Sequence, residues 1–327
     1  MKAISLFSGG LDSQIAVCLI KEQGITVEAL NFKSPFFGAD ERTAKAAEDL
    51  QVKLHTIDFG SEYITKVLKN PVYGYGKNMN PCIDCHGFMF RKAGDLMQEI
   101  GASFIVTGEV VGQRPMSQNK SALNAVDKLS GYKGYILRPL SAKILPPTIA
   151  ENEGWVDREK LEGISGRSRH RQMELAEKFN ITDYPSPAGG CLLTESNFSN
   201  RLKKMLDIRP DSSPYEMELL KLGRHFYLNQ NLLAVGRNRV ENEKIQAIAL
   251  DNDLLLKVTD RPGPTGLLRQ HENATAEEIN LAAAIVARYS DAKEEPYATI
   301  KIYNSKEEII NTVEIKPMPA LEVPASI

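Results

Sequence analysis

Residues 5–16 read SLFSGGLDSQIA and join a short apolar run to a helical pattern through one serine and two glycines. The apolar residues up to Phe7 predict a buried strand, and the pattern after Gly10 predicts a helix. A Ser-Gly-Gly turn in this position presents several backbone N–H groups, which together attract an anion. The glycines also permit unusual φ values and close approach of a ligand. The stretch therefore predicts a loop that binds phosphate.

The first third of the chain continues this alternation of strand and helix. Strands are expected at Ala3–Phe7, Val27–Phe32, Leu54–Ile57 and Phe104–Val106, and helices at 14–23, 42–50 and 88–100. Such alternation predicts an α/β fold with a doubly wound parallel sheet. Ligands of these sheets bind beyond the carboxyl ends of the strands, which is where the Ser-Gly-Gly turn lies.

Length and charge set broad limits on the protein. A chain of 327 residues is long enough for two domains, and its net charge of −2 provides no overall attraction to nucleic acid or membranes. No apolar run has membrane-spanning length, which indicates a cytoplasmic protein without a membrane partner. We expect an ATP-binding domain at 1–145, a connector with the second cysteine loop at 146–205, and a smaller α+β domain at 206–327. Within this plan 136–172, rich in proline and charge, is expected to be only partly ordered.

The residues around the turn add groups that suit a bound nucleotide. Asp12 would place a carboxylate beside bound phosphates, which makes sense where a cation such as Mg²⁺ lies between them. Ser8 and Ser13 add hydroxyl donors. No Gly-Lys-Ser/Thr sequence follows the turn, so a Walker P-loop is excluded.

The string SGGLDS resembles the pyrophosphate loop of the PP-loop ATP pyrophosphatases, which cleave ATP between the α and β phosphates and adenylate an oxygen of their substrate. The resemblance implies that ATP pyrophosphate and Mg²⁺ are held by Ser8, Gly9, Gly10, Leu11, Asp12 and Ser13. It also implies that adenine lies against the second strand, through the backbone around Asn31 and Phe32.

The cysteines distinguish among the members of this superfamily. Cys82 and Cys85 form a CxxC pair and Cys191 lies in a Gly-rich loop, whereas Cys18 lies on an apolar helix stripe and is expected in the core. The stretch 80–114 is similar to the bacterial tRNA 2-thiouridylases. The similarity implies that Cys85 is the catalytic cysteine, that Cys191 is close to the family's second cysteine, and that Thr107 and Gly108 form the ATP-side turn.

This stretch departs from the 2-thiouridylases at two positions. Cys82 replaces the usual aspartate, and Glu109 stands where the family has a histidine that contacts ATP, which puts that contact in doubt. A CxxC pair with a distant cysteine also resembles the 2-thioribothymidine synthetases, in which three cysteines bind a [4Fe–4S] cluster and leave one iron open for sulfide. That resemblance makes Cys82, Cys85 and Cys191 cluster ligands, which is the leading hypothesis.

Two other uses of these cysteines remain open. Cys85 and Cys191 suit a persulfide and disulfide pair. Zinc bound by the three cysteines, with or without His86, is the structural alternative.

The last third resembles the RNA-binding domain of NFACT proteins over most of 215–270. Short strands there alternate with basic and aromatic residues, which suit phosphate contacts and base stacking. These residues are Arg224, His225, Tyr227, Arg237, Arg239, Lys257, Arg261 and Arg269.

Together these features predict an ATP-dependent tRNA sulfurtransferase that adenylates a uridine carbonyl oxygen and replaces it with sulfur. The sulfur would come from sulfide or a persulfide carrier. One alternative is a PP-loop amidase or ligase that acts on a small metabolite and holds structural zinc. The other is a non-catalytic RNA-binding protein that uses ATP only as a ligand.

Overall fold

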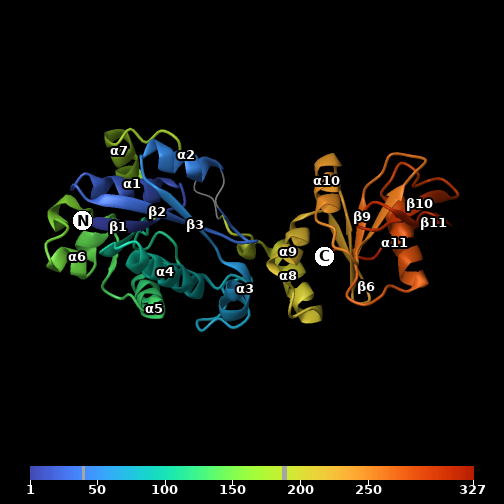
Figure 1. Cartoon of the computed structure of the whole chain (residues 1–327), viewed down its shortest axis with the longest axis horizontal. Coiled ribbons are helices and arrows are strands. Elements are labelled where there is room, and N and C mark those ends of the chain that lie inside the picture. Colours follow the sequence, from blue (N-terminus) through green and yellow to red (C-terminus); the bar gives the residue numbers. More distant parts are fainter. Residues whose placement is uncertain (39–40, 186–189) are drawn as a thin grey trace. The chain divides into compact units, whose positions relative to one another are not determined.

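The computed structural model describes residues 1–38, 41–185 and 190–327. The described residues form two compact units, Met1–Thr194 and Glu195–Ile327, coloured blue to yellow-green and yellow to red in Figure 1. No helix within these described ranges is both long and apolar enough to cross a membrane.

The N-terminal unit is built on a five-stranded parallel sheet of order β3-β2-β1-β4-β5. Its strands are β1 (Lys2–Leu6), β2 (Thr26–Lys33), β3 (Leu54–Asp58), β4 (Phe104–Thr107) and β5 (Ile136–Leu137). The strand order reverses between β1 and β4, so the ligand crevice of such a sheet lies beyond the carboxyl ends of these two strands. The predicted doubly wound parallel sheet is confirmed.

Helices cover both faces of this sheet, with α1, α2 and α7 on one side and α4 and α5 on the other (Figure 1). Their bounds are α1 (Leu11–Lys21), α2 (Glu41–Asp49), α3 (Gly60–Tyr63), α4 (Cys82–Glu99), α5 (Lys120–Ser130), α6 (Ile149–Asn152) and α7 (His170–Lys178). α4 begins six residues before the expected start at Phe88. Its first turn carries Asp84, whose charge favours a helix N-terminus although it interrupts the apolar pattern.

The stretch 136–172 is folded into the N-terminal unit, so the expectation of a partly ordered connector was wrong. Leu140 and Ala150 are fully buried and Leu161 is 2% exposed, all within the same apolar core as Phe7 and Leu137. These apolar residues come from short elements and turns. Because no helix or strand in the stretch is long enough to repeat them regularly, periodicity does not reveal their burial.

The C-terminal unit has a six-stranded antiparallel sheet of order β11-β10-β8-β9-β7-β6. The strands are β6 (Arg224–Leu228), β7 (Asn231–Val235), β8 (Leu254–Val258), β9 (Gly266–Arg269), β10 (Ala298–Tyr303) and β11 (Ile309–Ile315). The helices are α8 (Ser196–Ile208), α9 (Pro214–Met217), α10 (Arg239–Ala247) and α11 (Ala276–Arg288).

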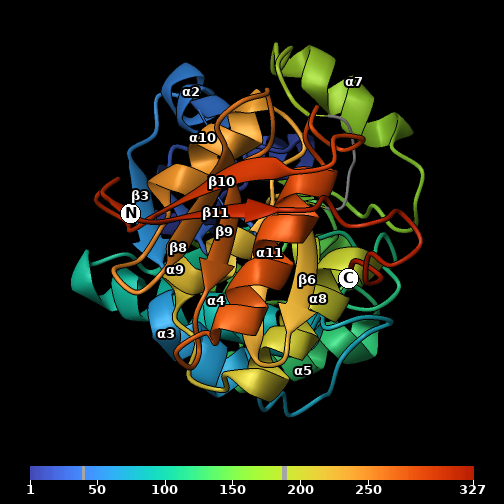
Figure 2. The same cartoon turned by 90° about the vertical axis from the view of Figure 1, so that its right-hand side faces the viewer.

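Helix α11 lies across one face of this sheet and closes the second core (Figure 2). Its N-terminus carries the predicted capping box, in which the Thr275 hydroxyl accepts from the Glu278 N–H and the Glu278 carboxylate accepts from the Thr275 N–H. The predicted α+β character of this unit is confirmed.

Candidate functional site

The phosphate-binding turn lies where the fold places ligands, between β1 and α1. Gly9 has a φ of +72°, in the left-handed region that favours glycine. Gly10 is the N-cap of α1, and no side chain caps this helix end. The Gln14 side chain, in the first turns of α1, donates to the Gly9 carbonyl over 2.8 Å and so fixes the turn to the helix. The N–H groups of the first helical turn thus remain available to an anion.

The two turns assigned to ATP are in contact. A Cβ atom at Gly108, in the turn after β4, would lie 2.6 Å from both the Asp12 carbonyl carbon and the Ser13 nitrogen. Only glycine allows the second turn to approach the first turn of α1 this closely. The structure therefore brings together Thr107-Gly108 and the SGGLDS loop, as the resemblance implied.

Asp12 retains one carboxylate oxygen for a ligand. Its Oδ2 accepts a hydrogen bond from Gln113 over 3.1 Å, while its buried Oδ1 has no hydrogen-bond partner among the described residues. A buried carboxylate oxygen without a partner is costly unless a cation or donor joins it. This oxygen suits the Mg²⁺ that ATP would bring.

The adenine-side residues lie on β2 beside this crevice. The Asn31 amide donates to the Phe7 carbonyl over 2.6 Å, and its Oδ1 is buried without a partner within the described residues. Phe32 packs against Phe59 with ring centroids 4.9 Å apart. Contact of adenine with the backbone at these positions remains a prediction.

The cysteines gather around the start of α4. Cys85 is buried at 8% exposure, while Cys82 and Cys191 are half-buried. Burial raises the pKa of the Cys85 thiol well above its ordinary value; the nearby Tyr63 hydroxyl lowers it to a smaller extent, and charge repulsion from Cys191 and Cys82 raises it again. This mutual influence places the three cysteines in one neighbourhood, and the thiol of Cys85 is protonated near neutral pH.

Hydrogen bonds join the segments that carry these cysteines. The Asn80 side chain donates to the Cys82 sulfur over 3.2 Å, and Asn78 donates to the Thr194 carbonyl over 2.7 Å. On the other side the Leu192 N–H donates to the Phe36 carbonyl over 3.0 Å. Cys191 is thus held between two segments of the N-terminal unit. The part of its predicted loop from Ser186 to Gly189 lies outside the described residues.

The chemistry of the three cysteines favours a metal, but their arrangement does not surround a single ion. Three thiols are the ligands that an iron–sulfur cluster or zinc prefers. Yet within 1–38, 41–185 and 190–327 no three Cys, His, Asp or Glu side chains lie close enough together to hold a metal ion. The described arrangement does not place three such donors around a single ion, and we derive no chemical step from a cluster.

Glu109 belongs to a buried chain of charges that sequence reasoning missed. It accepts from His86 over 2.8 Å and from Arg138 over 3.0 Å, and Arg138 continues to Asp127 over 2.7 Å. Burial alone would raise the pKa of Glu109, but the Arg138 charge and the His86 hydrogen bond outweigh it and hold that pKa below its ordinary value. A signal was present, because Arg138 interrupts an apolar run, which is typical of a buried, paired charge.

We expect Arg138→Met to destabilise the N-terminal unit by about 3–5 kcal/mol, because it leaves the Glu109 carboxylate buried without its main partner. A carboxyl group whose folded-state pKa is depressed stabilises the fold above its unfolded pKa and loses that contribution as pH falls through the folded value. The loss should therefore be large at pH 7 and shrink below the ordinary pKa of 4.5. Urea unfolding at pH 7 and pH 4 measures it.

The double variant Arg138→Met/Glu109→Gln is the matched control for this prediction. Removing the charge together with its partner should recover part of the lost stability at pH 7. An equal loss in both variants, or a loss independent of pH, would show that lost packing and not the unpaired carboxylate is responsible.

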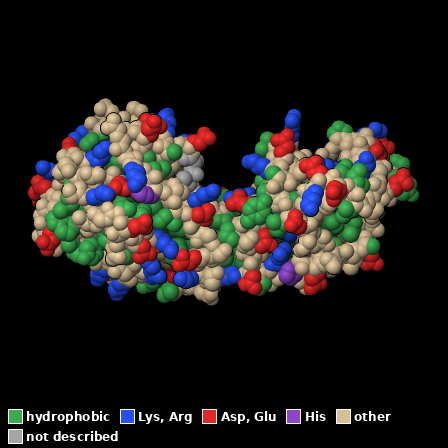
Figure 3. Space-filling view, viewed as in Figure 1, with side chains coloured by type: hydrophobic (Ala, Val, Ile, Leu, Met, Phe, Trp, Pro, Cys, Tyr) green, Lys and Arg blue, Asp and Glu red, His purple; other side chains and the backbone are tan. Residues whose placement is uncertain are grey.

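The candidate RNA-binding residues of the C-terminal unit fall into two groups. Arg237, Arg239 and Arg261 are exposed and pair with Glu241, Glu243 and Glu295, respectively. Arg224 lies over the Tyr289 ring at 4.6 Å, Lys204 lies over the half-buried Tyr227 at 5.6 Å, and Lys257 bonds to Gln246. Basic and acidic side chains are interspersed on the face drawn in Figure 3. For the exposed residues, RNA binding remains a prediction.

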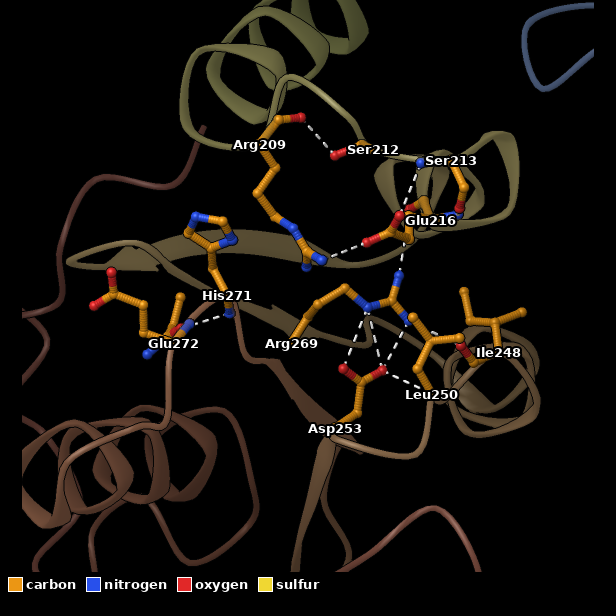
Figure 4. A network of polar contacts seen from close by, with 11 residues as sticks. Arg209, Ser212, Ser213, Glu216, Ile248, Leu250, Asp253, Arg269, His271 and Glu272 are labelled. Carbon is orange, nitrogen blue, oxygen red and sulfur yellow. Dashed lines mark hydrogen bonds and ion pairs between the residues drawn. The ribbon is translucent and has the colours of Figure 1, made fainter. Parts of the chain in front are cut away.

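The structure overturns the prediction for Arg269 and His225. Arg269 is 2% exposed, and its guanidinium donates to Asp253 over 2.8 Å and to the backbone carbonyls of Glu216 and Ile248 (Figure 4). His225 is fully buried and bonds to the Leu222 carbonyl. Burial and the nearby Arg201 charge lower the pKa of His225 to about 3, so it is neutral near pH 7. Both side chains stabilise the fold and neither can reach a phosphate.

Comparison with known proteins agrees with this architecture. The family model described as tRNA methyl transferase HUP domain matches residues 1–161. The N-terminal half of the chain is therefore similar to the HUP domain of that family. The model described as NFACT protein RNA binding domain matches residues 223–326, so the C-terminal unit is similar to that domain.

Individual proteins resemble this combination only in part. The tRNA-specific 2-thiouridylase MnmA of Marinobacter nauticus is 28% identical over 220 residues, which cover 62% of this chain and 53% of that protein. The chain spans about half the length of the curated relatives it matches.

Two solved structures match parts of this chain at low similarity. One is a 4-thiouridine synthetase–RNA complex with bound ATP (21% identity, TM-score 0.35, covering 55% of this chain and 51% of that chain). The other is the U34-tRNA thiolase NcsA from Methanococcus maripaludis with its [4Fe–4S] cluster (18% identity, TM-score 0.33, covering 70% and 74%).

Proposed function

We propose that this chain is an ATP-dependent tRNA thiouridine synthase, with the HUP domain as its catalytic unit and the NFACT-type domain as a tRNA-binding unit. The observation that carries the proposal is the hydrogen bond of 2.8 Å between His86 and Glu109. Glu109 follows the ATP-side turn directly, and His86 follows Cys85. One side-chain contact therefore joins the predicted ATP site to the predicted sulfur site.

This arrangement supports a reaction in two steps. A uridine carbonyl oxygen attacks the α-phosphorus of ATP, and pyrophosphate leaves. A sulfur nucleophile then attacks the adenylated carbon, and AMP leaves with the former carbonyl oxygen. Mg²⁺ held with the phosphates would offset their charge. The N–H groups of the SGGLDS loop and the free Oδ1 of Asp12 are the groups of this chain that would bind the phosphates and the ion.

The names of the relatives support the choice of substrate. MnmA is a tRNA-specific 2-thiouridylase, and the two solved structures are a 4-thiouridine synthetase and a tRNA thiolase. The NFACT-type domain adds a module whose family is described by RNA binding. The proposal therefore joins an ATP-binding fold, three neighbouring cysteines and an RNA-binding module, and tRNA thiolation uses all three.

The finer proposal concerns how the sulfur is carried. The sequence predicts that Cys82, Cys85 and Cys191 hold a [4Fe–4S] cluster that accepts sulfide. Among the described side chains no three such donors surround a single ion, whereas a cluster takes each thiolate on a different iron. A persulfide route needs only two of the cysteines: the outer sulfur of a Cys85 persulfide attacks the activated carbon, and Cys191 then releases it by forming a disulfide with Cys85. That disulfide must be reduced by an external dithiol before the next turnover.

A reconstituted assay tests the proposal. The full chain, purified without oxygen, is mixed with tRNA transcript, ATP, Mg²⁺ and sulfide, and the nucleosides are analysed by mass spectrometry. We expect one thiouridine per tRNA and stoichiometric AMP and pyrophosphate. Iron and acid-labile sulfide are measured on the same protein: about four irons per chain support the cluster, whereas an iron-free protein that uses a persulfide donor supports the second route. A protein with zinc that forms no thionucleoside would contradict the proposal and favour the small-metabolite ligase.

A further inference from the structure

An exposed aromatic loop lies next to the cysteines and has no part in the chemistry described above. Val72 is 75% exposed, Tyr73 is 49% exposed and Tyr75 is 42% exposed. Large apolar side chains that gather on a surface in this way commonly mark a site of interaction. Three such side chains lie within four residues, shortly before the CxxC pair, and packing in the core does not account for them.

The backbone of this loop is fixed from the cysteine helix. The buried Asp84, which lies between the two cysteines of the CxxC pair, accepts hydrogen bonds from the N–H groups of Val72 over 2.6 Å and Tyr73 over 3.0 Å. The Tyr75 hydroxyl donates to the Leu68 carbonyl over 2.6 Å, and the Gly76 N–H donates to the Asn80 carbonyl over 3.0 Å. The aromatic side chains are therefore displayed from a well-supported backbone, which lowers the entropic cost of binding.

The same loop is connected to all three cysteines. Asp84 links it to Cys82 and Cys85, and Asn78 links it to the Cys191 segment through the Thr194 carbonyl. The loop therefore lies close to the segments that carry these sulfurs. The hydroxyl of Tyr75 is held by its hydrogen bond to Leu68. Tyr73 is the more exposed of the two tyrosines, and its hydroxyl has no hydrogen bond within the described part of the chain.

We propose that Tyr73 stacks on an unpaired base of the RNA, next to the uridine that receives sulfur. The inference rests on the proposed function and adds a contact that selects single-stranded RNA. An exposed ring on a fixed backbone is the arrangement that binds bases without regard to their identity. The exposed Lys77 in the same loop provides a positive charge for the adjoining phosphate. This combination of ring and cation fits a nucleotide better than it fits an apolar peptide.

Kinetics of the full chain with sulfide as the sulfur source test the proposal. Tyr73→Ala should lower kcat/KM for tRNA by about tenfold or more, mainly through KM, and leave KM for ATP unchanged. Tyr73→Phe retains the ring and should keep near wild-type values. Tyr135→Ala is the matched control, because Tyr135 is 37% exposed but precedes β5, at the amino end of the strands, whereas the ATP turns follow the carboxyl ends of β1 and β4.

A second readout does not depend on thiolation. A tryptophan in Tyr73→Trp should be quenched by single-stranded RNA and much less by a duplex, while Tyr135→Trp should not respond. Without this quenching, or if Tyr73→Phe loses as much activity as Tyr73→Ala, the stacking proposal is overturned. It is also overturned if Tyr73→Ala is impaired only when a carrier protein supplies the sulfur, because the loop would then bind protein. If single-stranded RNA quenches Tyr73→Trp but the wild-type chain forms no thiouridine, the proposed function alone is overturned.

Discussion

Replacing Cys85 by serine should lower tRNA thiolation by about a thousandfold or more, because both proposed sulfur routes, the cluster and the persulfide, need the sulfur atom of Cys85. Pyrophosphate release on addition of tRNA and ATP should persist in Cys85→Ser, since adenylation uses the SGGLDS loop and not the thiol. Comparing thionucleoside formation with pyrophosphate release separates the two steps. The pattern predicted for the variant is activation of the tRNA without transfer of sulfur.

Cys18→Ala is the matched control for this experiment. Cys18 packs against the core on α1, where burial raises the pKa of its thiol to about 11. Removing this thiol should leave thiolation within about twofold of wild type, because the expected effect is a modest loss of packing. If Cys85→Ser still forms thiouridine from sulfide at the wild-type rate, Cys85 is not the sulfur-transferring residue.

Adding a single methyl group at Gly108 should disable the ATP site. The new Cβ of Gly108→Ala would lie 2.6 Å from backbone atoms of Asp12 and Ser13. A backbone segment cannot relieve such a clash by rotating, as the end of a flexible side chain can. The SGGLDS loop must then shift relative to the turn after β4. A displacement of about 1 Å in a catalytic site typically costs a hundredfold in rate, so we expect kcat/KM for ATP to fall by about that factor.

Gly163→Ala provides the comparison for this variant. A Cβ at Gly163 meets the Lys143 Cβ at 3.4 Å, an ordinary contact, and the substitution should leave ATP kinetics unchanged. Pyrophosphate release measured over a range of ATP concentrations distinguishes the two variants. Wild-type kinetics in Gly108→Ala would mean that the two turns do not form one site, and the assignment of ATP to this crevice would fail.

The features that could be predicted from the sequence are those that local patterns determine. Apolar runs of three to six residues separated by helical periodicity identify the first four strands of the N-terminal sheet, and Thr275 with Glu278 identifies the start of α11. The SGGLDS string and the CxxC pair carry their chemistry in a few adjacent residues. The structure agrees with the strands and the helix start, and the chemistry of the two motifs remains a prediction.

What could not be predicted depends on residues that only the fold brings together. Arg269 stands in a basic, strand-rich stretch that reads as an RNA-binding surface, yet it pairs with Asp253 inside the C-terminal unit. The series of hydrogen bonds from His86 through Glu109 and Arg138 to Asp127 joins four separate elements or turns of the N-terminal unit. Neither arrangement has a spacing that a single sequence displays.

The same limit applies to the metal. Three cysteines at suitable positions favour an iron–sulfur cluster on chemical grounds alone. Whether they can bind one depends on the distances among their sulfur atoms, and these are set by how the segments around Cys85 and Cys191 pack. The described arrangement does not provide three donors within reach of one ion.

The central claim is that this chain puts sulfur into tRNA through Cys85. Its most direct test is mass spectrometry of tRNA nucleosides from cells that lack the protein, complemented with the wild-type chain or with Cys85→Ser. We predict that one thionucleoside is missing, that the wild-type chain restores it, and that Cys85→Ser does not. A full set of thionucleosides at normal levels in cells without the protein would contradict the account.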